Sequence, residues 1–167
     1  EQPVFRKIKS LIDEKAIGDI KFITLNYFQP ALPQEEMMVP KNQWRVNPAI
    51  AGGGLFHDIA PHQLDLMLHW FGPVDMVAGT AVQQADQYAA DDMVAGILRF
   101  QNKAVFTGTW CFSALPAVRR DVCEVIGTTG MLSFSFFGQP VIELTTGENT
   151  ETIRFDTLPH VQQPMIE

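Results

Sequence analysis

The sequence lacks the features that mark nucleic-acid-binding and membrane proteins. It has no run of lysine and arginine, and its net charge of −7 argues against a nucleic-acid partner or an anionic membrane surface. No apolar run approaches the ~18 residues that a transmembrane helix requires, so we expect no membrane span. Tyrosine is scarce too, with two residues against twelve phenylalanines, an apolar load that suits a core and a subunit interface.

Cysteine is equally scarce. Cys111 and Cys123 are the only two, and their spacing fits neither a disulfide framework nor a metal-binding pair. We interpret both as reduced thiols in the core, which favours a cytoplasmic location.

The arrangement of apolar residues predicts an α+β fold. A chain of 167 residues is long enough for one domain with a substantial core. Helices are expected from Pro3 to Ile17 and from the glycines at 52–54 to about Phe71. Strands are expected at 20–28, 74–82, 93–100, 104–112, 120–126, 131–137, 141–144 and 152–155. Because turns link most of these strands, we expect one large, mostly antiparallel sheet with helices packed on one face.

Residues 30–50 are rich in proline and show little periodicity, so a long loop is expected there. The segment ends with Trp44 and Arg45, shortly before the glycines. The donors of Arg45 and the flat ring of Trp44 would suit a polyhydroxylated or anionic ligand. A surface arginine and a tryptophan that plugs the loop onto the core fit this pattern equally well.

The second helix carries a polar stripe. On a helical wheel, Asp58, His62, Asp65 and His69 fall within about 60° of one another. An acid one turn before a histidine can fix its tautomer and raise its basicity, which suits proton transfer. The glycines at the helix entrance would let the backbone approach a ligand. In the alternative, purely structural interpretation, Asp58 caps the helix, His62 is a core histidine and the rest is solvated.

Three further features of this region are interpreted as structural. Pro61 cannot donate to the carbonyl of His57, so we expect the helix to start late or to kink there. His57 lies outside the stripe and is interpreted as structural or as a support for the stripe. Asp91 and Asp92 precede a strand and are interpreted as turn residues rather than as a paired-carboxylate metal site.

The order of these features resembles the C-terminal domain of the glucose–fructose oxidoreductase / inositol dehydrogenase / rhizopine-catabolism (Gfo/Idh/MocA) family. The motifs that carry the resemblance are Ile17-Gly18, Trp44-Arg45, Gly52-Gly53-Gly54-x-x-x-Asp58-x-x-x-His62-x-x-Asp65, Asp92-Met93-Val94 and Ile126-Gly127-Thr128-Thr129-Gly130. The resemblance extends over roughly residues 3–157, and the glycine–Asp–His block is its most specific part.

The resemblance implies an oxidoreductase. Residues 1–167 would form a single C-terminal substrate and oligomerisation domain of a longer protein, whose N-terminal Rossmann domain would bind NAD or NADP. Substrates would be sugars, cyclitols or related alcohols, and a homo-oligomer, commonly a dimer, would form through the open sheet face. His62 would take the hydroxyl proton and Asp58 would orient it or hydrogen-bond the substrate. The residues assigned to substrate binding are Trp44, Arg45, Gly54 and Asp65.

Two motifs of the family are absent from the sequence. There is no G-x-G-x-x-G fingerprint, and no Glu-Lys-Pro motif, whose lysine is a catalytic partner in the family. We therefore expect the chain alone neither to bind a dinucleotide with normal affinity nor to turn over. Two other functions stay open: a metal-dependent isomerase or hydrolase with Asp58, His62 and Asp65 as ligands, and a non-catalytic dimerisation module.

Overall fold

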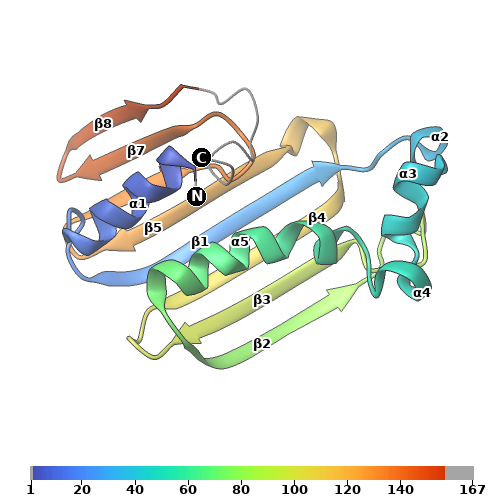
Figure 1. The fold of residues 1–167 in the computed structure, drawn as a ribbon, viewed down its shortest axis with the longest axis horizontal. Coiled ribbons are helices and arrows are strands. Elements are labelled where there is room, and N and C mark those ends of the chain that lie inside the picture. The colour runs from blue at the N-terminus through green and yellow to red at the C-terminus, as the bar shows by residue number, and fades with distance from the viewer. Residues whose placement is uncertain (1, 157–167) are drawn as a thin grey trace.

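The computed structural model describes residues 2–156, which form two layers (Figure 1). The helices are α1 (Pro3–Asp13), α2 (Gln34–Met37), α3 (Pro40–Gln43), α4 (Pro48–Ala51) and α5 (Leu55–Phe71), with short 3-10 turns η1 (Trp44–Val46) and η2 (Pro116–Val118). The strands are β1 (Ile20–Pro30), β2 (Val74–Val82), β3 (Met93–Phe100), β4 (Val105–Ala114), β5 (Arg120–Gly127), β6 (Gly130–Phe134), β7 (Val141–Thr146) and β8 (Asn149–Arg154). Helices α1 and α5 lie against one face of the sheet, so the predicted α+β architecture is confirmed.

The eight strands form one sheet in the order β2-β3-β4-β1-β5-β6-β7-β8. All neighbours pair antiparallel except β1 and β4, which run parallel in the centre. The exception arises because the chain leaves β1, crosses the sheet as α5, and returns through the β2–β3 hairpin to place β4 beside β1. Short turns predict the antiparallel neighbours, but they carry no information about where the first strand inserts.

The predicted element bounds agree best where turn residues flank the pattern. Strands β2 and β3 match the predicted ranges, whereas the first helix ends at Asp13 rather than Ile17. The last hairpin turns at Gly147, whose φ of +59° suits glycine. Strand β8 therefore begins at Asn149, earlier than the predicted residue 152.

The segment at 30–50 is not a structureless loop. Pro40 and Pro48 occupy the first positions of α3 and α4, where a missing N–H costs nothing. Met37 and Val46 are buried, so the segment has an apolar interior of its own side chains or its neighbours. The prediction of a long loop was wrong because these prolines begin short helices instead of interrupting structure.

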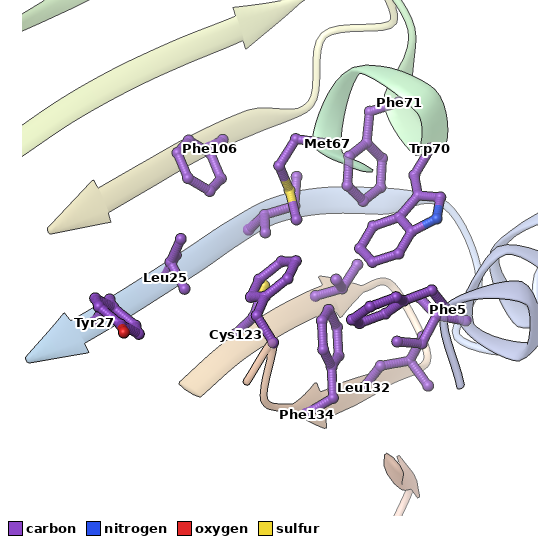
Figure 2. Close-up of a cluster of buried hydrophobic side chains, with 14 of the residues drawn as sticks. Phe5, Leu25, Tyr27, Met67, Trp70, Phe71, Phe106, Cys123, Leu132 and Phe134 are labelled. Carbon is purple, nitrogen blue, oxygen red and sulfur yellow. The ribbon is translucent and has the colours of Figure 1, made fainter. Parts of the chain in front are cut away.

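Helix α5 is held on the sheet by large apolar side chains. Figure 2 shows Met67, Trp70 and Phe71 pointing into the cluster that contains Phe134 and the other labelled strand residues. Met67 is fully buried, and the ring of Trp70 lies 5.6 Å from that of Phe134 in an edge-on contact. This anchor fixes which side of α5 faces the sheet and, with it, which side faces outward.

The start of α5 differs from expectation. The helix begins at Leu55 and continues through Pro61, so a late start is ruled out. Pro61 has no N–H to donate to the carbonyl of His57. Because both residues are exposed, this unpaired carbonyl lies on the solvent side of the helix. Within residues 2–156, no helix is long and apolar enough to cross a bilayer.

Both cysteines are unpaired, as predicted. Cys123 is fully buried in the core, whereas Cys111 is only half-buried and lies on the open face of the sheet, so its predicted place in the core was wrong. Burial raises the pKa of the Cys123 thiol well above its ordinary value, because the thiolate would lose its hydration.

Candidate functional site

The polar stripe lies on the outward face of α5. His62, Asp65 and His69 are exposed and Asp58 is partly exposed, whereas the opposite side of the helix is buried against the sheet. The alternative that made His62 a core histidine is therefore wrong. Asp58 is not the N-cap either, because Gly54 holds that position. Asp58 lies in the first helical turn, where the helix dipole stabilises a carboxylate.

Asp58 and His62 are neighbours on this face. Residues four apart on a helix have Cβ atoms about 5–6 Å from each other. Both side chains are accessible to a ligand approaching from solvent. An acid and an imidazole one turn apart can share a hydrogen-bonded substrate group or each other.

A cation faces the acid of this pair. The Nε atom of Arg45, in η1, lies 3.6 Å from Oδ2 of Asp58, and the two side chains are 43% and 32% exposed. The guanidinium also lies over the ring of Trp44, with its central carbon 5.5 Å from the ring centroid. Stacking and ion pairing together restrict Arg45 to one orientation. The sequence placed Trp44 and Arg45 near the site, but nothing in their spacing indicated that Asp58 is the partner.

The glycines between α4 and α5 serve close packing. Gly52 has a φ of +75° and ends α4. A Cβ on Gly53 would lie 2.0 Å from Nδ1 of His57, so the imidazole fills the space that a side chain would need. Gly54 is buried, and a Cβ there would lie 2.7 Å from the Cβ of Ala90. The loop between β2 and β3 therefore covers Gly54, which we had expected to face a ligand.

Asp92 organises that loop. Its side chain is 1% exposed, Oδ1 accepts the N–H of Gln84 at 2.9 Å and Oδ2 accepts the N–H of Ala85 at 2.8 Å. These bonds agree with the interpretation of Asp91-Asp92 as turn residues. Nothing in the residue pattern indicates that this carboxylate is buried, because an acidic residue before a strand is ordinarily solvated.

A buried hydrogen bond supports the stripe from below. Gln63 follows His62 on the helix, is fully buried, and accepts the indole N–H of Trp110 on β4 at 2.6 Å. The Trp110 ring also meets Phe56 edge-on at 5.1 Å between centroids. The middle of α5 is thus tied to the sheet by polar as well as apolar contacts.

The described residues do not form a metal centre or a dinucleotide site. Within residues 2–156, no three His, Cys, Asp or Glu side chains gather as a metal would require, so Asp58, His62 and Asp65 do not converge. No glycine-rich turn follows either strand of the parallel pair β1 and β4, as a dinucleotide fold would require. The stripe is instead an exposed helix face that carries two carboxylates and two imidazoles.

The chain belongs to the GFO/IDH/MocA family, because the model of that family's C-terminal domain matches residues 5–133. The resemblance noted in the sequence is thereby confirmed.

Relatives and solved structures agree with this assignment. The oxidoreductase P35 of Formosa agariphila is 38% identical over 169 residues, an alignment that covers 100% of this chain and 50% of the relative. An inositol dehydrogenase homologue from Azotobacter vinelandii, complexed with NAD+, superimposes with a TM-score of 0.79 at 14% identity over 90% of this chain and 40% of that one. Levoglucosan dehydrogenase, in complex with NADH and levoglucosan, gives 0.73 at 24% identity over 88% and 42%.

Because the identities to the two solved structures are this low, these matches show only that the fold is shared. The chain spans about half the length of the relatives it matches.

Proposed function

We propose that this chain is the C-terminal, substrate-binding half of a longer NAD(P)-dependent oxidoreductase that acts on a sugar, a cyclitol or a related alcohol. The observation that carries the proposal is the accessible Asp58–His62 pair on the outward face of α5, with Arg45 against the acid. Family membership supports the reaction class. The neighbours support the ligands, since one holds NAD+ and another holds NADH with levoglucosan.

His62 is the proposed general base. A nicotinamide, when bound, would supply the hydride acceptor for oxidation of an alcohol, and the hydroxyl of the substrate would have to give up its proton. The imidazole of His62 takes that proton, because histidine is the side chain that titrates near neutrality. In the reverse direction the same group returns the proton to the carbonyl oxygen.

In this scheme Asp58 exchanges no proton and instead orients the imidazole of His62 or the substrate. Its carboxylate already faces the guanidinium of Arg45 at 3.6 Å, so its position is set before a substrate arrives. From there it accepts a hydrogen bond from the imidazole or from a substrate hydroxyl one helical turn away.

The surroundings of the pair suit a polyhydroxylated ligand. Trp44 is 43% exposed, and the side chain of Arg45, also 43% exposed, carries guanidinium donors that a ligand could accept from. Asp65 adds a carboxylate one turn beyond His62 on the same face, where it would accept substrate hydroxyls. Gly54 shapes the entrance of the helix in this proposal instead of touching the substrate.

The sheet face opposite α1 and α5 is the proposed subunit interface. It carries exposed apolar side chains on three strands, namely Phe22, Met76, Val82 and Ile97. Phe22 is 46% exposed and Ile97 is 42% exposed, which is costly for a face left in water. A second copy packed against this face would form a homodimer with both stripes turned away from the interface.

The test is nicotinamide reduction by the complete protein, expressed with its native upstream sequence. We expect NAD+ or NADP+ to be reduced in the presence of inositol, levoglucosan or another polyol. His62→Ala should lower kcat by about 10²–10⁴-fold, the range for a general base. Leu68→Ala changes another exposed residue of the same helix, outside the stripe, and should stay within about threefold.

Two results would overturn the proposal. One is an upstream region without a Rossmann fingerprint. The other is a complete protein in which His62→Ala keeps the wild-type kcat for nicotinamide reduction. Either would favour the non-catalytic dimerisation module.

A further inference from the structure

We propose that Asp92 is a positioning residue: it holds the β2–β3 loop so that Ala90 presses on Gly54 and sets where the acid–histidine end of α5 lies. The inference rests on the proposed function, because it assigns a role to residues that touch neither substrate nor cofactor. It links a buried carboxylate at the end of a hairpin to the geometry of Asp58.

The first link is the tie between Asp92 and its loop. Both carboxylate oxygens are occupied, one by the N–H of Gln84 and the other by the N–H of Ala85. The backbone of Asp92 is fixed as well, since its N–H donates to Val82 at 3.2 Å and its carbonyl accepts from Phe112 at 2.8 Å. The loop is therefore fastened to β2 and β4 through a single residue that water does not reach.

The second link is the contact between the loop and the helix. Ala90 is 3% exposed and faces Gly54, at the N-cap of α5. A Cβ built on Gly54 would lie 2.7 Å from the Cβ of Ala90 and 3.1 Å from the carbonyl oxygen of Asp91. The two segments are thus in closest approach, and any side chain at Gly54 would push them apart.

The third link runs from Gly54 to the stripe. The carbonyl of Gly54 accepts the N–H of His57 at 3.0 Å, and Asp58 follows in the same turn. Because a helical turn moves nearly as one body, displacing Gly54 displaces Asp58 relative to Arg45. A misplacement of about 1 Å at a reacting group can cost about 10²-fold in rate.

The contact between Ala90 and Gly54 can be tested by moving the methyl group from residue 90 to residue 54. Gly54 has a φ of −115°, which alanine adopts freely, so Gly54→Ala adds only the steric clash. In the complete protein we expect Gly54→Ala to lower kcat at least about tenfold. Ala90→Gly alone should stay within about threefold. The double variant should be faster than Gly54→Ala, because only the 3.1 Å approach to the carbonyl oxygen of Asp91 remains. Gly96→Ala is the matched control, since a Cβ there meets only an ordinary contact at 3.6 Å.

If the contact between Ala90 and Gly54 were merely structural, Gly54→Ala would lower stability but would not lower the kcat of the folded protein. The kcat values are therefore measured at a temperature where circular dichroism finds every variant fully folded. Wild-type kcat in Gly54→Ala would overturn the inference, and so would a double variant as slow as Gly54→Ala. Asp92→Asn turns an amide donor toward a backbone N–H and should also lower kcat, whereas Asp86→Asn in the same loop, at an exposed position, should not.

Failure of the proposed function gives a different result. If the wild-type complete protein reduces no nicotinamide, hydrogen exchange of the first-turn amides of α5 still tests the inference. Exchange at residues 57 and 58 should speed up in Gly54→Ala and return toward wild type in the double variant. Equal exchange in all three proteins would overturn the loop–helix coupling without reference to activity.

Discussion

The Nε atom of Arg45 lies 3.6 Å from Oδ2 of Asp58, so the acid of the candidate pair is held by a residue from a separate short helix. Within residues 2–156 this nitrogen is buried and has no hydrogen-bond partner. A buried donor that faces only a carboxylate at ion-pair distance depends on Asp58 for its compensation. The same guanidinium rests on Trp44, so three side chains form one unit.

Arg45→Lys is expected to damage this unit although it keeps the charge. Lysine offers no planar group to stack on Trp44 and no fork of donors. We expect kcat/KM in the complete protein to fall by about 10-fold or more, with Arg45→Met falling further. Arg99→Met is the control, because it removes an exposed ion pair with Asp75 on the edge hairpin and such pairs contribute about 0–1 kcal/mol. Equal rates in Arg45→Lys and wild type would contradict the expectation.

Gln63→Leu is expected to destabilise the fold by about 1–3 kcal/mol, since it leaves the buried indole N–H of Trp110 without an acceptor. Combining it with Trp110→Phe removes both polar partners, so the double variant should lose less than the sum of the two single changes. Urea unfolding monitored by circular dichroism measures each free energy. Strict additivity would show that the Gln63–Trp110 bond contributes nothing.

Ile97→Glu is expected to dissociate the proposed dimer. It introduces a charge in the middle of the open sheet face, where a second copy would have to bury it. Val77→Glu is the control: Val77 is 72% exposed on the neighbouring strand but points to the helix side of the sheet. Sedimentation equilibrium should give the monomer mass for Ile97→Glu alone. An unchanged mass for both variants would move the interface elsewhere.

Cys123 is expected to resist alkylation in the folded protein at pH 8. Its thiol has a raised pKa because burial disfavours the thiolate, and the thiolate is the nucleophile. Iodoacetamide should modify Cys111 first and reach Cys123 only after denaturation, as peptide mass spectrometry would report. Labelling is best done in Ile97→Glu, in which the open face that carries Cys111 is free.

The same shift gives stability a pH dependence. A folded-state pKa above the unfolded value means that the native state holds the proton more tightly, so the contribution is complete below the unfolded thiol pKa of about 8.5 and declines above it. Cys123→Ala should flatten this decline in the free energy of unfolding, whereas Cys111→Ser should not. A decline equally steep in Cys123→Ala would assign it to other groups.

Local chemistry made much of the fold predictable. Strands β2 and β3 follow the alternation of their side chains and end where turn residues begin, so both bounds agree with the prediction. The parallel placement of β1 beside β4 was out of reach, because it depends on a pairing between residues about 80 positions apart, such as Thr24 with Thr107.

The site was predictable to a similar extent. Helical periodicity alone placed Asp58 and His62 on one face, and the structure turns that face outward. The partnership of Arg45 with Asp58 depends on how the glycine turn folds back, which no spacing rule encodes. The burial of Asp92 was not predictable either. Its two donors are the backbone N–H groups of Gln84 and Ala85, and backbone groups are the same in every non-proline residue.

Helix α5 keeps its two tasks on opposite sides. Met67 and Trp70 are committed to the sheet, whereas His62 and Asp65 contribute almost nothing to folding because they remain in water. Replacements along the outer side should therefore change the stability of the domain little. The outer side of the helix can consequently vary in sequence while the side that packs on the sheet stays the same.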